Sequence, residues 1–263
     1  MTKRCAVALM LLIATPALAG ADAVMPLQPS PTWEALRPDV IGTDRDPAPA
    51  DCILTLEAPA RAANPAVVPV HLTQPAGAPA IARLVLVADE NPSPVVATFT
   101  FGPALHPLDL ELRIRVDAYS DLRAIATLAD GRQVMAGQFV KASGGCAAPA
   151  GYDAEAAARI GEMRLKSAPA PDGRMLSTLM IRHPQFSGFQ RDQVTLLNIP
   201  ARFLDQIEVR QGDALLFTLE GGISLSEDPV IRFAHPPGTA PVTVTASDTD
   251  GQHFTLQPAK VAP

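Results

Sequence analysis

The stretch Leu108-Asp109-Leu110-Glu111-Leu112-Arg113-Ile114-Arg115-Val116 alternates apolar and charged side chains without interruption. Side chains of a β-strand point alternately to opposite faces, so five apolar residues share one face and four charged residues share the other. Such a strand is typical of an antiparallel sheet that covers a core with one face and meets solvent with the other. We therefore predict a half-buried strand here, with its charged face solvated.

Six further runs of apolar or β-branched residues accompany this strand in the first half of the chain. Turn-forming residues separate them, including the hairpin-type pair Asp130-Gly131. The runs are residues 53–57, 67–72, 83–88, 95–101, 122–128 and 133–140. Seven short strands with frequent turn signals predict an immunoglobulin-like β-sandwich that ends at Val140.

The second half repeats this pattern, with turn residues at Gly212-Asp213 and Asp250-Gly251. Its apolar runs are residues 161–166, 175–181, 203–211, 214–219, 230–234, 242–247 and 252–257. An alanine-rich stretch, residues 152–160, predicts a short helix in the linker. The expected fold class is all-β, with two immunoglobulin-like β-sandwich domains in tandem, residues 52–150 and 151–263.

The first 23 residues have the features of a secretory signal peptide. A basic start, Thr2-Lys3-Arg4, precedes an apolar run, residues 5–13, and the small-x-small cleavage site Ala17-Leu18-Ala19, with Ala21-Asp22-Ala23 as a second option. We expect export to the periplasm and a soluble mature protein without a membrane anchor, because the apolar run is too short for a permanent span. Residues 24–51 are rich in proline and predict an extended segment. Within it, the helical spacing of Trp33, Leu36 and Val40 predicts a short turn of helix that docks on the first domain.

Composition and motifs exclude several function classes. The net charge of −6 and the aromatic content of 5% argue against nucleic-acid binding. Nucleophile-elbow, phosphate-loop and Cys-x-x-Cys motifs are missing from the sequence, and the five histidines are not spaced as metal ligands usually are. We therefore expect no enzyme activity, no cofactor and no metal.

The candidate functional residue is Cys146, which follows Gly144 and Gly145 between the two halves. Glycines adopt backbone conformations that other residues avoid, so these two can form a flexible arm that lifts the thiol off its domain. Within five residues on either side of Cys146, Lys141 is the only charge. This favours a cysteine served by external enzymes over a self-activating nucleophile. The alternative is a linker whose cysteine forms half of a disulfide.

Two further features bear on this cysteine. Cys5 leaves with the signal peptide, so Cys52 is the second thiol of the mature chain, either an exposed structural thiol or a resolving partner for Cys146. A bridge between them would need their Cα atoms within about 7 Å. The polar connection over residues 182–200 contains His183, Pro184 and Gly188 and is a possible partner surface.

At this point the sequence resembles a known family. The first half is similar to the Y subunit of the SoxYZ carrier of bacterial thiosulfate oxidation in Ile53-Leu54-Thr55-Leu56-Glu57-Ala58-Pro59, Ala66-Val67-Val68-Pro69-Val70, Glu90-Asn91-Pro92-Ser93-Pro94, Ala97-Thr98-Phe99, Phe101-Gly102-Pro103 and Gly144-Gly145-Cys146. The second half is similar to the Z subunit in Ile181-Arg182-His183-Pro184, Gly188, Phe203-Leu204, Ile223-Ser224, Asp228-Pro229, Val230 to Phe233 and Thr249-Asp250-Gly251. A single chain with both parts resembles the SoxYZ-like carriers associated with quinoprotein dehydrogenases.

The resemblance implies a periplasmic carrier without catalysis of its own. Cys146 would hold a sulfur intermediate covalently on a mobile arm that includes Gly144 and Gly145. Partners would be sulfur-oxidising enzymes, c-type cytochromes or a quinoprotein dehydrogenase system. This sequence departs from the family pattern because alanines and a second domain follow the cysteine, where the family arm ends as Gly-Gly-Cys-Gly-Gly. An arm tethered at both ends sweeps less space, which puts insertion into a narrow enzyme channel in doubt.

Three classes of function remain open at this stage. The leading one is the covalent sulfur carrier. The second is a non-catalytic adaptor or structural partner of an exported quinoprotein dehydrogenase, with Cys146 in a disulfide. The third is a hydrolase or metal enzyme, which stoichiometric bound metal would support.

Overall fold

A computed structural model describes residues 25–149, 151–152 and 154–256 of the 263-residue chain. The predicted signal peptide, residues 1–23, and the predicted domain boundary at Ala150 lie outside the described residues. Two sheets face each other across one hydrophobic core that draws residues from both halves of the chain, such as Leu84, Leu112 and Phe217. The predicted all-β sandwich fold is confirmed.

The larger sheet has nine strands and the smaller one six. In spatial order the first contains β1 (Ala48–Pro49), β8 (Gln133–Val140), β7 (Ser120–Leu128), β4 (Ile81–Ala88), β5 (Val95–Phe101), β12 (Ala214–Gly221), β11 (Leu204–Gln211), β14 (Val242–Asp248) and β15 (His253–Thr255). The second contains β2 (Thr55–Glu57), β3 (Val68–Thr73), β6 (Asp109–Ile114), β13 (Val230–His235), β10 (Met175–Ile181) and β9 (Met163–Pro169). A 3-10 turn, Pro103–Leu105, links β5 to β6.

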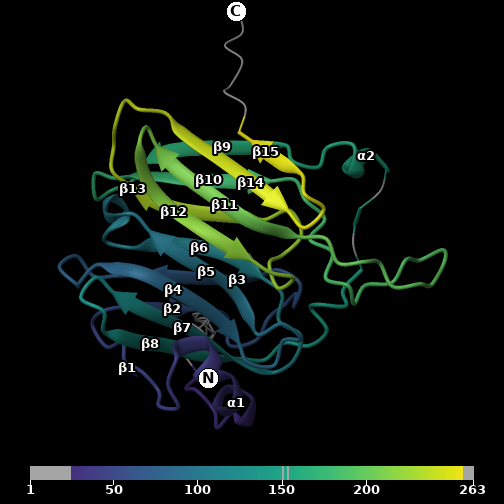
Figure 1. The fold of residues 1–263 in the computed structure, drawn as a ribbon, viewed down its shortest axis with the longest axis horizontal. Helices are drawn as coiled ribbons and strands as arrows, with labels where there is room; N and C mark the ends of the chain where they lie inside the picture. The colour runs from purple at the N-terminus through teal and green to yellow at the C-terminus, as the bar shows by residue number, and fades with distance from the viewer. Residues whose placement is uncertain (1–24, 150, 153, 257–263) are drawn as a thin grey trace, which may run out of the picture.

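Both sheets run continuously from one half of the chain into the other. β5 pairs with β12, placing Phe99 opposite Leu219, and β6 pairs with β13, placing Leu112 opposite Ile231. In Figure 1 the blue first half and the green-to-yellow second half therefore form one stack of strands. The two halves share their sheets as well as their core, and we call the line of contact between them the seam.

Each run predicted as a strand overlaps a strand of the structure. β1 was not predicted because it has two residues and pairs in parallel with β8. The alternation in β6 also holds, since Leu110, Leu112 and Ile114 are buried. The charged face, however, is not solvated along its whole length. Arg115 is 1% exposed, so the prediction of solvent exposure is wrong at this position. β6 ends at Ile114, and Arg115 lies at the seam among acceptors of both halves.

The helix predicted from Trp33, Leu36 and Val40 is present as α1 (Pro31–Ile41). It begins at Ser30, whose hydroxyl accepts a hydrogen bond from the Trp33 backbone N–H at 3.0 Å. It ends at Gly42, which adopts the left-handed conformation that glycine tolerates. Trp33 is buried against β4 and β7, with the Arg123 guanidinium 4.8 Å from its ring centre.

The alanine-rich linker forms the short helix α2 (Ala154–Ala157) at the side of the molecule (Figure 1). Among the described residues, none of the helices is both long enough and apolar enough to cross a bilayer.

Candidate functional site

Cys146 lies at the seam, on a segment that crosses the end of β6. We call residues 144–148 the cysteine segment. The backbone N–H groups of Gly144 and Gly145 donate to the carbonyl oxygens of Asp117 and Val116, at 2.6 and 3.2 Å. The Cys146 N–H donates to Oδ1 of Asp117 at 3.0 Å. The segment is therefore docked on the first half by three consecutive backbone donors.

The two glycines have separate structural roles in this docked conformation. Gly144 has a φ of +80°, in the left-handed region that favours glycine. A Cβ on Gly145 would lie 2.2 Å from the carbonyl oxygen of Pro65 and 2.6 Å from that of Val116, so no larger residue fits. Gly145 thus lets the backbone approach the chain just after β6 closely, whereas Gly144 supplies a left-handed backbone conformation. The predicted mobility of the arm stays a prediction.

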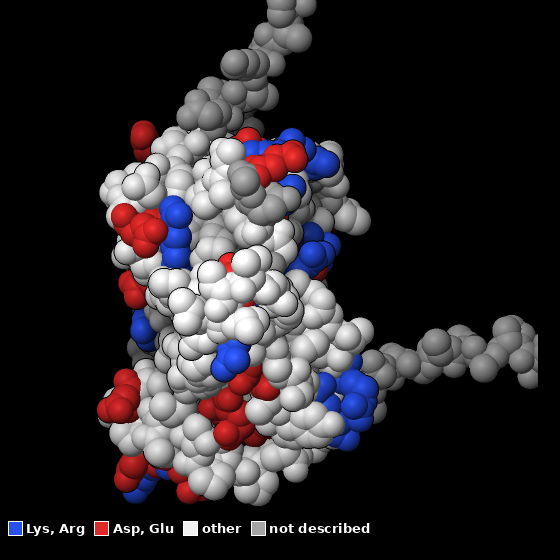
Figure 2. Space-filling view, turned by 90° about the vertical axis from the view of Figure 1, so that its right-hand side faces the viewer, with Lys and Arg blue, Asp and Glu red and all other residues white. Residues whose placement is uncertain are grey.

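The second half of the chain holds the same segment from the other side. The Ser187 hydroxyl donates to the carbonyl oxygen of Cys146, and Nε2 of Gln190 donates to that of Ala148 at 3.1 Å. Both side chains belong to the connection between β10 and β11. This connection projects from the side of the molecule in Figure 1, and Figure 2 looks onto that side. The cysteine segment thus lies between the two halves and is bound by both.

Arg115 joins three parts of the site. Its Nη1 donates to the carbonyl oxygen of Gly145 at 3.3 Å, its Nη2 to that of Gln185 at 3.2 Å and its Nε to that of Leu225 at 3.3 Å. Burial lowers the pKa of this guanidinium, but arginine stays charged in proteins at neutral pH. A buried cation held by backbone carbonyls therefore lies beside the cysteine segment.

The Asn91 side chain makes hydrogen bonds to the segment that follows β6 and to the second half. Its Nδ2 donates to the carbonyl oxygen of Arg115 at 2.8 Å and to the Ser224 hydroxyl at 3.0 Å. Its Oδ1 accepts from the Asp117 N–H at 2.8 Å. Because Ser224 belongs to the second half, this one amide fixes both the β6 end and the seam.

The Cys146 side chain is fully buried, at 0% exposure. The pKa of its thiol is raised to about 12, chiefly by burial and also by the nearby Asp117 carboxylate, while Arg115 acts in the opposite direction. In this conformation the group is a protonated thiol without contact to solvent. The prediction of an accessible thiol on an extended arm is wrong for the docked state, because both halves close over the segment.

The second predicted thiol, Cys52, is exposed and has a φ of 58°. Cys52 and Cys146 are both free thiols in the structure. The structure therefore does not show the disulfide that the sequence left open.

The predicted partner surface needs correction. His183 is 0% exposed and Pro184 is also buried, whereas Gly188 is half-buried. His183 packs inside the second half, where Nε2 lies 3.3 Å from Oδ2 of Asp248 and Nδ1 accepts from the Gln185 N–H at 3.1 Å. Desolvation lowers the pKa of His183 despite the Asp248 carboxylate. The exposed apolar side chains of this connection lie further along the chain, at Phe189, Val194, Leu196 and Leu197.

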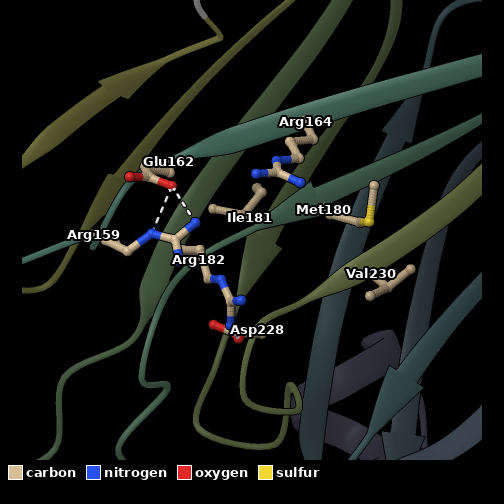
Figure 3. A pocket seen from close by; sticks show the side chains of 8 residues that line it. All are labelled: Arg159, Glu162, Arg164, Met180, Ile181, Arg182, Asp228 and Val230. Carbon is tan, nitrogen blue, oxygen red and sulfur yellow. Dashed lines mark hydrogen bonds and ion pairs between the residues drawn. The ribbon is translucent and has the colours of Figure 1, made fainter. Parts of the chain in front are cut away.

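A cleft of about 260 Å³ lies on the second half, over β9, β10 and β13 (Figure 3). Its residues are Arg159, Glu162, Arg164, Met180, Ile181, Arg182, Asp228 and Val230. Arg159 is 2.9 Å from Glu162, and Arg182 is paired with Asp228. Cys146 does not line this cleft. The two ion pairs of the cleft, one between residues three apart in the chain and one between the segments that flank β10 and β13, are partly exposed and are explained as ordinary surface pairs.

No group of three His, Cys, Asp or Glu side chains that could hold a metal is found within the described part of the chain. Among the residues that the structure describes, neither a histidine nor a carboxylate is hydrogen-bonded to the Cys146 sulfur. Reaction of this buried thiol with a molecule from solvent requires that the thiol first becomes accessible.

The fold and the site define a class: a two-part β-sandwich protein with a buried cysteine at the junction of its parts. Comparison with known families gives two matches. Residues 37–146 match the family of sulfur oxidation protein SoxY, and residues 163–258 match that of sulphur oxidation protein SoxZ. The chain is a tandem SoxY and SoxZ protein and belongs to the SoxYZ-like fusions. No curated protein sequence matches it. The SoxY match ends at Cys146, and the predicted boundary at Ala150 falls between the two matches.

Several residues of the site were not predicted from the sequence. Asp117, Ser187 and Gln190 are polar residues of connecting segments, which carry no local signal for contact with a distant cysteine. Arg115 did carry a signal, because it is the last charge of the alternating stretch, where the strand pattern ends.

Proposed function

We propose that this protein is a periplasmic covalent carrier of sulfur compounds, with Cys146 as the attachment residue and partner enzymes as the catalysts. The SoxY and SoxZ domains support a role in sulfur oxidation and contact with sulfur-oxidising enzymes. The observation that carries the proposal is the place of Cys146, at the end of the SoxY match and on a segment that hydrogen bonds from both halves hold without a covalent link. The signal-peptide features of residues 1–23 support the periplasmic location.

The attachment of thiosulfate to Cys146 is an oxidation, so it needs an electron acceptor. Joining the Cys146 thiol to thiosulfate forms a sulfur–sulfur bond, giving a cysteine S-thiosulfonate, and releases one proton and two electrons. A c-type cytochrome partner would accept the electrons. The proton would leave the thiol in the undocked state, where desolvation no longer raises its pKa.

Undocking has an approximate free-energy cost. Six hydrogen bonds hold the segment, four to the first half and two to the second. A net contribution of about 1 kcal/mol for each gives about 6 kcal/mol, or an open fraction on the order of one in tens of thousands. The free carrier is thus closed nearly all the time, and a partner that binds the open form shifts this equilibrium.

A second function is favoured by one observation, the complete burial of Cys146. In this alternative the chain is an adaptor for an exported quinoprotein dehydrogenase, and Cys146 is a packing residue. Its pKa of about 12 and the close fit of Gly145 agree with such a role.

Replacement of Cys146 by serine separates the two functions. We expect Cys146→Ser to abolish sulfur-compound oxidation by the host while the protein level stays constant, and we expect Cys52→Ser, the matched control, to leave oxidation intact. Retention of oxidation by Cys146→Ser would favour the adaptor. Cell fractionation and amino-terminal sequencing of the mature protein test the location, with cleavage after Ala19 or Ala23 expected.

A further inference from the structure

The connection between β10 and β11 ends in an exposed apolar turn. Val194 is 90% exposed, Leu197 71% and Leu196 67%. We call these three side chains the apolar tip. Single exposed aliphatic residues are common on protein surfaces, but a cluster of them at the end of a projecting loop marks an interaction site. In Figure 2, which looks onto this side of the molecule, the middle of the face is largely free of charged side chains.

Hydrogen bonds hold the apolar tip in shape. Oδ1 of Asp192 accepts from the Val194 and Thr195 N–H groups at 3.0 and 2.6 Å and from the Thr195 hydroxyl at 2.9 Å. The Leu196 N–H donates to the Asp192 carbonyl oxygen, and the Asp192 N–H donates to that of Leu197, both at 2.9 Å. Leu196 has a φ of 60°, a conformation that leucine usually avoids. The turn is preorganised, which reduces the entropy lost when it binds a partner.

The base of the same connection holds the cysteine segment. Ser187 and Gln190 donate to the carbonyl oxygens of Cys146 and Ala148. Phe189, which lies between them in the sequence, is 49% exposed and adds a further exposed apolar side chain at this end of the connection. A protein seated on the apolar tip would therefore contact the loop that covers Cys146.

We propose that the apolar tip docks into an apolar pocket on the enzymes that load or unload Cys146. This proposal rests on the proposed carrier function and adds the surface by which the partner is recognised. Residues 193–197 carry no charge, so recognition depends on buried apolar area and not on charge pairing. The apolar tip belongs to the same loop as Ser187 and Gln190, which hold the cysteine segment. A partner docked on the tip would therefore be bound to the loop from which the cysteine segment must separate.

The test compares sulfur loading of Cys146 in the native host. The variant combines Val194→Ser, Leu196→Ser and Leu197→Ser, and the control is Val95→Ser, which removes an exposed apolar side chain from the start of β5. The chain is purified without reductant, and the fraction of Cys146 peptide that carries a sulfur adduct is measured by mass spectrometry. We expect loading to fall about tenfold in the triple variant, as for loss of interface hot spots, and to stay unchanged in Val95→Ser.

A second measurement separates docking from damage to the site. Purified wild type and triple variant should react equally fast at Cys146 with the small reagent dithionitrobenzoate, because the tip does not contact the cysteine. Equal loading in the host would overturn this inference alone, and absence of any adduct on wild-type Cys146 would overturn the carrier function with it. A wild-type dimer that the triple variant converts to a monomer, or tip-dependent binding to phospholipid vesicles, would assign the tip another occupant and overturn the inference.

Discussion

The Arg115 guanidinium donates a hydrogen bond to the carbonyl oxygen of Gly145, 3.3 Å away, and so holds the residue that precedes the cysteine. The same side chain binds the carbonyl oxygens of Gln185 and Leu225 in the second half. One residue at the end of β6 therefore links the position of the cysteine segment to the seam between the SoxY and SoxZ domains.

Arg115→Lys should loosen the segment. Lysine cannot place three donors in the fixed fork of a guanidinium, so carbonyl oxygens lose their partners in a buried place. We expect the free energy of unfolding to fall by about 1–3 kcal/mol and the reaction of Cys146 with dithionitrobenzoate to become faster. Arg113→Lys, an exposed position on the same strand, is the control. Equal rates in wild type and Arg115→Lys would show that Arg115 does not restrain the segment.

Gly145→Ala should undock the cysteine segment. Its Cβ would lie 2.2 Å from the Pro65 carbonyl oxygen, a contact with backbone that rotation of a side chain cannot relieve. Gly144→Ala is the matched comparison, since its Cβ meets open space and the cost is confined to the left-handed backbone, about 1–2 kcal/mol. Hydrogen exchange of the segment should therefore increase more in Gly145→Ala than in Gly144→Ala. The reverse order would contradict the docked geometry.

Stability should depend on pH through Cys146. The folded pKa of about 12 lies above the ordinary value of 9.0, so the folded state favours the protonated thiol. The resulting stabilisation is fully present below pH 9 and is lost as the pH rises toward 12, at about 1.4 kcal/mol per pH unit. This contribution is the difference between the free energies of unfolding of wild type and Cys146→Ser, measured by urea unfolding between pH 8 and 11. Parallel pH profiles of the two proteins would contradict a buried thiol.

Asp117→Asn should separate charge from geometry at the cysteine. The amide oxygen can still accept the Cys146 N–H, but the negative charge that raises the thiol pKa is removed. We expect the pKa of Cys146 to fall while the segment stays docked. Ultraviolet titration of the thiolate, with Cys146→Ser as the blank, gives the pKa. An unchanged titration would mean that burial alone accounts for the shift.

The strands could be predicted because their signals are local. The alternation in residues 108–116 and turn pairs such as Asp130-Gly131 act within a few residues of the chain, and so does the spacing of Trp33, Leu36 and Val40. The continuity of the two sheets could not be predicted in this way. The β5–β12 and β6–β13 pairs join edges that are more than 100 residues apart, and a strand pattern does not specify its partner.

The geometry of the candidate site could be predicted only in part, because it too depends on contacts between residues far apart in the sequence. Gly144-Gly145-Cys146 indicated Cys146 as the candidate residue, and its role stays a prediction. Glycine suits both a mobile arm and a close backbone approach, and the sequence alone does not distinguish them. The structure shows the close approach at Gly145. Burial of Arg115 likewise depends on the seam, which forms only when both halves meet. Burial of His183 depends on contacts within the second half, with Asp248 and Gln185, that are distant from it or not specified by a local pattern.

The most direct test of the account is the intact mass of the native protein, isolated under non-reducing conditions and followed by mapping of the Cys146 peptide. We predict a population with sulfur, sulfite or thiosulfonate on Cys146 that reductant removes, and no such adduct on Cys52. A Cys146 peptide that carries only a free thiol or a disulfide, in cells actively oxidising sulfur compounds, would contradict the carrier function.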